Sequence, residues 1–85
     1  MYKVLITNSA QKSVRNIPDD YYEVIVKHIS ELAKNPRPNG SIKLSGFKDT
    51  YRIRVGIYRI IYIVKDEIIT VNVIKIDHRS SVYKK

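Results

Sequence analysis

The sequence contains no cysteine and only two histidines. Without thiols the chain can form neither a disulfide nor a thiolate-bound zinc or iron–sulfur centre, and two imidazoles alone make a poor metal site. The chain therefore lacks the disulfides that stabilise most small secreted domains, which argues against that class of protein. We expect no metal and no other cofactor.

Long apolar runs and chain breakers are also scarce. The longest apolar run, residues 60–64, is far below the roughly 18 residues of a spanning helix, and the first residues, MYKVLIT, predict a strand rather than a signal sequence. With 44% hydrophobic residues, 3 Gly and 3 Pro, the chain has enough apolar surface for one core. Its 85 residues predict a single domain, 1–85, with a cytoplasmic location and no membrane contact.

Acidic residues are outnumbered two to one. The chain has 16 Lys+Arg against 8 Asp+Glu, a net charge of +8. Residues 1–42 carry six basic and four acidic side chains, whereas residues 43–85 carry ten basic and four acidic ones. Surplus lysine also serves solubility, but a charge confined to one half is typical of a binding surface. The composition therefore predicts an anionic partner for the C-terminal half.

The first half of the chain has the pattern of a strand followed by two helices. Residues 2–7 are apolar and β-branched, and Asn8-Ser9 then offers an N-cap to a short helix whose apolar face carries Ala10, Val14 and Ile17. Pro18 can open a second helix, expected over about residues 18–34. Its apolar stripe consists of Tyr22, Ile25, Ile29 and Leu32. The Pro- and Asn-rich segment 35–40 ends this helix.

From residue 42 onward the apolar period changes to two. Strands are expected at about 42–44, 51–55, 57–64 and 68–76. The short turns between them can join only antiparallel neighbours. We therefore predict an α+β fold of order βααββββ, in which a two-helix hairpin packs on one face of a four-stranded antiparallel meander.

Three arginines are predicted to share a surface. In residues 51–55, YRIRV, the side chains of Arg52 and Arg54 point away from those of their apolar neighbours. The next strand carries Arg59. If the turn places Arg59 on the same face, three permanent charges converge where only water or an anion can separate them. Each arginine alone would be an ordinary solubilising residue, but the three together favour a phosphate-binding site.

The residues after the last strand add other chemistry. We expect His78, Arg79 and Tyr83 to fold back over the same face, where they offer a titratable group, a phosphate-stabilising charge and an aromatic ring. This mixture suits cleavage of an RNA backbone. His28 lies near the helix stripe and is interpreted as a structural residue with a satisfied ring nitrogen. The tyrosines expected to meet the core are Tyr21, Tyr22, Tyr51, Tyr58 and Tyr62.

Four segments in this order resemble the RelE/ParE toxin superfamily, and its RelE branch in particular. They are IKLSG at 42–46, DTYRIRVG at 49–56, YRIIY at 58–62 and DHRSSVY at 77–83. The resemblance covers essentially the whole chain and implies a small twisted antiparallel sheet with a helical hairpin on one side. It also implies cleavage of messenger RNA in the ribosomal A site, and an antitoxin that wraps around the toxin, inhibits it and can form a hetero-oligomer with it.

The resemblance also assigns positions. The paired basic residues of the family's strand fall on Arg52 and Arg54, the arginine of the Tyr-Arg pair on Arg59, the arginine after the last strand on Arg79, and the terminal aromatic on Tyr83. Lysine occupies the paired positions in the best-studied RelE members. Arginine stays protonated because its pKa lies above about 12, so it cannot act as a general base.

His78, which other branches place near the cut, can supply the missing base. The candidate catalytic residues are thus Arg52, Arg54, Arg59, His78, Arg79 and Tyr83, and the candidate substrate-binding residues are Lys43, Lys48 and Lys84. The predicted function is a type II toxin that acts as a metal-independent, ribosome-dependent endoribonuclease. Two alternatives stay open: a non-catalytic DNA gyrase inhibitor, as in the ParE branch, and an inactive RNA-binding relic.

Overall fold

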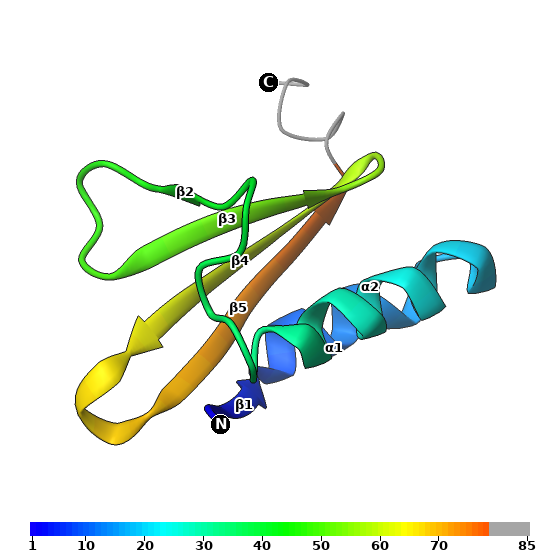
Figure 1. Ribbon diagram of the computed structural model, residues 1–85. Helices are drawn as coiled ribbons and strands as arrows, with labels where there is room; N and C mark the ends of the chain where they lie inside the picture. Colours follow the sequence, from blue (N-terminus) through cyan, green and yellow to red (C-terminus); the bar gives the residue numbers. More distant parts are fainter. Residues whose placement is uncertain (79–85) are drawn as a thin grey trace.

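The structure, a computed structural model, describes residues 1–78 and contains the predicted elements in the predicted order (Figure 1). They are β1 (Lys3–Ile6), α1 (Asn8–Arg15), α2 (Asp19–Glu31), β2 (Ile42–Lys43), β3 (Thr50–Val55), β4 (Tyr58–Lys65), a 3-10 turn η1 (Asp66–Ile68) and β5 (Thr70–His78). The α+β class and the βααββββ order are confirmed.

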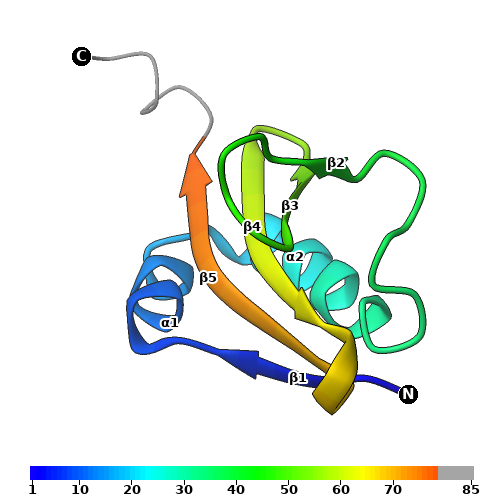
Figure 2. The same cartoon turned by 90° about the vertical axis from the view of Figure 1, so that its left-hand side faces the viewer.

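The strands form one five-stranded sheet in the order β1-β5-β4-β3-β2. Strands β2 to β5 are the antiparallel meander, and β1 joins the far edge, parallel to β5. Both helices lie against one face of this sheet (Figures 1 and 2). Within residues 1–78, no helix covers the opposite face of β3, β4 and β5.

The helix ends differ slightly from the predicted ones. The N-cap of α1 is Thr7, whose Oγ1 accepts a hydrogen bond from Ala10 N at 3.2 Å, one residue before the predicted cap. Helix α2 ends at Glu31 rather than near residue 34. The amides of residues 32–34 bond to carbonyls three residues earlier, which tightens the last turn into a 3-10 geometry.

The core lies between the helices and the inner face of the sheet. The buried residues of α1, the link that follows it and α2 include Ala10, Ile17, Ile25 and Ile29. Leu32, Tyr58 and Tyr62 are buried as predicted, and Tyr51 is half-buried against the core.

Tyr21 and Tyr22 are predicted to meet the core, but both are exposed. Tyr22 lies with Val14 and Val26 in a shallow groove between the two helices instead of over the sheet. Tyr21 packs edge-on against Tyr58 at the margin of the core, with ring centroids 5.3 Å apart. The stripe of α2 therefore begins at Ile25.

A polar cluster ties the chain together at the end of the sheet near η1. The Asp66 carboxylate accepts hydrogen bonds from Tyr2 Oη at 2.6 Å and Arg37 Nη2 at 2.8 Å, and Arg37 Nε donates to Tyr51 Oη at 2.9 Å. The bonds from Arg37 and then Tyr2 lower the pKa of Asp66, and the bond to Asp66 raises the pKa of Arg37. The cluster fixes the 35–41 loop against the sheet.

Candidate nucleic-acid interface

The hairpin between β3 and β4 sets the position of the arginines. Only Gly56 and Ile57 connect the two strands, and Gly56 has a φ of +61°, a conformation that favours glycine at the first position of a two-residue hairpin turn. This turn places Arg54 directly opposite Arg59, while Arg52 lies opposite Ile61. The Cβ atoms of directly opposed residues are about 4.5–5.5 Å apart.

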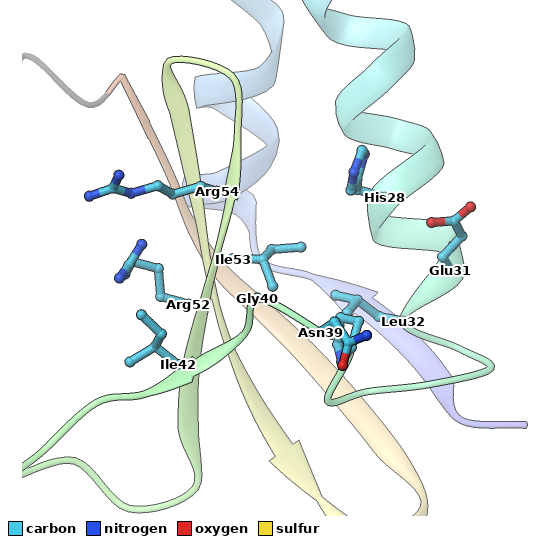
Figure 3. Close-up of a pocket in the computed structure, with 10 residues that line it drawn as sticks. His28, Glu31, Leu32, Asn39, Gly40, Ile42, Arg52, Ile53 and Arg54 are labelled. Atoms are coloured by element: carbon cyan, nitrogen blue, oxygen red, sulfur yellow. The ribbon is translucent and has the colours of Figure 1, made fainter.

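The three arginines lie on the face of the sheet that the helices leave uncovered. Figure 3 shows Arg52 and Arg54 pointing to one side of β3, while Ile53 points to the other, toward α2. Because Arg54 and Arg59 are cross-strand partners, Arg59 shares the side of Arg54. We call the surface formed by Arg52, Arg54 and Arg59 the arginine face. Strand alternation predicts this grouping, and the structure has it.

The row of opposed residues continues onto β5, where Asp77 lies opposite Arg59. Asp77 Oδ2 is 3.8 Å from Arg59 Nη2 and 3.6 Å from Lys75 Nζ. No role is predicted for Asp77 from the sequence pattern. Lys75 and Asp77 alternate with apolar residues, which indicates that both side chains lie on the polar face of the last strand. Only the register of β5 against β4 shows that the Asp77 carboxylate lies beside Arg59.

The structure places His78 differently from the prediction. Strand β5 extends to His78 instead of ending near residue 76, so His78 belongs to the strand rather than to a returning tail. It lies opposite Tyr58, with the two rings perpendicular at a centroid distance of 5.3 Å. Alternation puts Asp77 on the arginine face and His78 on the other side of the strand end.

The two candidate lysines that the structure describes are not gathered at this face. Lys43 pairs with Tyr51, so alternation turns it away from Arg52, and Lys48 is exposed in the loop that precedes β3. Arg79, Tyr83 and Lys84 lie outside the described residues. The structure therefore unites Arg52, Arg54 and Arg59 but not the two described lysines.

An open groove of about 730 Å³ runs beside the arginine face, between α2, the segment 38–42 and β3. His28 and Glu31 line its helix side, and Arg52 and Arg54 also contribute to its lining (Figure 3). His28 Nδ1 is 2.9 Å from the Val24 carbonyl, which confirms its predicted structural contact. One wall of the groove is formed by the 35–41 loop, and no sequence pattern predicts how this loop packs.

The arginine face has the chemistry of an anion site. Guanidiniums remain protonated at physiological pH and present several N–H donors to phosphate oxygens. Within residues 1–78 there is no group of three His, Cys, Asp or Glu side chains that could hold a metal ion. In the same part of the chain, neither helix combines the length and apolar character needed to span a membrane.

Known proteins match nearly the full chain. The family model described as "ParE toxin of type II toxin-antitoxin system, parDE" matches residues 4–83. Toxin RelG of Mycobacterium tuberculosis (strain ATCC 25618 / H37Rv) is 27% identical over 85 residues, which are 99% of this chain and 98% of that protein.

Solved structures of RelE toxins match as well. The toxin in the intact E. coli RelBE complex is 31% identical, with a TM-score of 0.79 over 89% of this chain and 94% of that one. For the archaeal RelE–RelB complex from Pyrococcus horikoshii OT3 the identity is 30% and the TM-score 0.83, over 92% and 94%. The isolated E. coli RelE toxin is 32% identical, with a TM-score of 0.81 over 98% and 92%. The chain therefore belongs to the RelE/ParE family of toxins from type II toxin–antitoxin systems.

Proposed function

We propose that this toxin is a metal-independent endoribonuclease that cleaves messenger RNA in the ribosomal A site, and hence acts in the cytoplasm. The observation that supports this most is the arginine face: Arg54 and Arg59 directly opposed across two strands, with Arg52 on the same open side. Like charges in opposed positions are destabilising, and Asp77 offsets them only at 3.8 Å from Arg59, beyond hydrogen-bond distance. The phosphates of an RNA backbone supply further anions for this face.

The proposed reaction uses the substrate's own 2′-OH as the nucleophile. It attacks the adjacent phosphorus, the bond from phosphorus to the 5′-oxygen breaks, and the products are a 2′,3′-cyclic phosphate and a 5′-OH. The protein must remove the 2′ proton, neutralise charge on the non-bridging oxygens and protonate the leaving oxygen. We assign neutralisation to Arg54 and Arg59, and alignment of the backbone to Arg52 and Tyr83. Lys43, Lys48 and Lys84 contribute longer-range attraction.

Proton transfer is assigned to His78, assisted by Arg79 or Tyr83. The exposed imidazole lies at the end of β5, next in sequence to Asp77, so an RNA strand that passes around the strand end can contact both His78 and the arginine face. General acid–base catalysis contributes about 10²–10⁴-fold to a rate.

We expect His78→Ala to lower cleavage on programmed ribosomes by about 10²-fold, because it removes the proton acceptor. The matched control is His28→Ala, which removes the other imidazole from a position on α2 and should leave the rate unchanged. Cleavage products mapped by primer extension give both rates. An undiminished rate in His78→Ala would exclude histidine from the mechanism.

A cognate antitoxin is part of the proposal. Several relatives of known structure are RelE–RelB complexes, which include those from E. coli and P. horikoshii. We propose that this chain likewise forms a hetero-oligomer with an antitoxin that covers it. The +8 charge favours a partner segment that is acidic or amphipathic.

Gyrase inhibition is the second candidate, because the matching family model is that of ParE toxins. Translating ribosomes incubated with the protein, followed by mapping of message ends, separate the two functions. We expect cuts at fixed positions within codons. Inhibition of DNA supercoiling with intact message would favour the gyrase inhibitor, and salt-sensitive RNA binding without cuts would indicate an inactive RNA-binding protein.

A further inference from the structure

Asp77 is the only acidic residue in the five strands that the structure describes. Those strands carry seven basic residues, namely Lys3, Lys43, Arg52, Arg54, Arg59, Lys65 and Lys75. The single carboxylate lies in the same row as the opposed arginine pair, next to Arg59 and across that strand from Arg54. From this position the negative charge offsets part of the repulsion between the two guanidiniums, mainly through Arg59.

The contact between Asp77 and its cations is electrostatic and loose. The distances of 3.8 Å to Arg59 and 3.6 Å to Lys75 are longer than hydrogen bonds. The side chains of Arg59 and Asp77 are only 17% and 18% exposed, so water screens their attraction incompletely. The carboxylate is held near Arg59 by charge without occupying its donors.

Arg59 has unused donor capacity in this arrangement. Its Nε is buried and makes no hydrogen bond to any group of residues 1–78. A buried donor without an acceptor costs free energy until an acceptor arrives. Asp77 is tethered to β5 and stays 3.8 Å from Arg59, whereas the two non-bridging oxygens of a phosphodiester are free to approach and can engage two guanidinium nitrogens at once. Arg59 is thus only partly satisfied by Asp77 and better suited to a phosphodiester.

We propose that Asp77 is an internal counter-anion that occupies the anion position on Arg59 in the free toxin and is displaced by a phosphate of the bound RNA. This inference rests on the proposed function, which assigns the arginine face to RNA. Asp77 then sets the affinity for phosphate: it stabilises the unliganded row of arginines and weakens RNA binding by competing with the substrate. If Asp77 instead served to position Arg59, its removal would have the opposite effect on binding.

The test uses Asp77→Asn, which keeps the shape and removes the charge, and a 2′-deoxy oligonucleotide that cannot be cut by 2′-OH attack. Fluorescence anisotropy should show binding about 5–10-fold tighter than wild type, with a slope of log affinity against log salt that is steeper by about one. The control is Glu67→Gln, which changes net charge equally in η1 and should alter affinity less than twofold. Affinity equal to or below that of wild type in Asp77→Asn overturns the proposal.

A second comparison ties the effect to Arg59. In an Arg59→Gln background, Asp77→Asn should raise the affinity for the oligonucleotide no more than Glu67→Gln does, because the cation for which Asp77 and phosphate compete is absent. A gain that persists would overturn the assignment to Arg59. Circular dichroism checks that each variant is folded. If the Asp77→Asn protein does not fold, Asp77→Ser is measured in its place.

A readout without RNA separates this inference from the proposed function. Inorganic phosphate titrated into the protein should shift the Arg59 Nε–H resonance at lower concentration in Asp77→Asn than in wild type. That result would support the counter-anion even if ribosomes showed no cleavage. Identical titrations would overturn it even if cleavage were found.

Discussion

Replacing Arg59 with alanine is expected to lower message cleavage on programmed ribosomes by about 10²–10³-fold while the protein stays folded. The loss of one charged donor to a developing oxyanion has effects of about this size. Arg54→Ala should be similar, because Arg54 faces Arg59 across the hairpin and both guanidiniums flank the same anion position. Single-turnover cleavage at saturating ribosome concentration measures the chemical step rather than binding.

The matched control is Arg15→Ala, which removes the same charge from the exposed end of α1 on the other side of the molecule. It should keep cleavage within a few-fold of wild type. Arg59→Lys keeps the charge but loses the planar donor geometry, so an intermediate rate is expected. If Arg54→Ala and Arg59→Ala both cleave as fast as wild type with unchanged circular dichroism, the arginine face is not the active surface.

Tyr62→Ala is expected to destabilise the fold by about 3–5 kcal/mol, the range for truncating a buried aromatic residue. Tyr62 is fully buried in the centre of β4, its ring stacks on that of Tyr51 at 5.9 Å, and its hydroxyl donates to the Pro36 carbonyl at 2.8 Å. Truncation would leave a cavity and release the 35–41 loop. For a domain of this size the melting temperature should fall by about 15 °C or more, whereas a fall of only a few degrees would contradict a central role for Tyr62.

The conservative variant Tyr62→Phe separates the hydroxyl from the ring. At pH 7 it should cost about 1 kcal/mol, the net contribution of one hydrogen bond. Burial raises the pKa of Tyr62 to about 12, from about 10 in the unfolded chain. The unfolded chain therefore loses this proton first as pH rises, and wild-type stability falls between about pH 10 and 12.

Tyr62→Phe lacks that step, so its stability deficit should shrink to about zero near pH 11. Urea unfolding at pH 8 and pH 11 measures the difference between the two proteins at each pH. A deficit that is the same at both pH values would show that Tyr62 does not titrate as its burial requires.

The arginine face and the element order followed from local pattern. Arg52 and Arg54 alternate with apolar residues, so any strand that buries Ile53 must turn both guanidiniums to the other side. Apolar residues recur with different periods in helices and in strands, so the two kinds of element can be told apart. The boundaries between elements coincide with Pro18, the 35–40 segment and Gly56. These features depend on neighbours within a few residues, which is why the sequence determined them.

Other features depended on contacts between distant segments. The parallel pairing of β1 with β5, the placement of the 35–41 loop by Arg37 and Asp66, and the length of β5 are set by partners far along the chain. The register of β5 against β4 moved His78 off the expected face and brought Asp77 beside Arg59. A shift of one residue exchanges the two faces of a strand. The sequence alone thus determined which residues can bind an anion, and the tertiary structure decided which of them meet, because alternation fixes sides within a strand while only pairing fixes neighbours across strands.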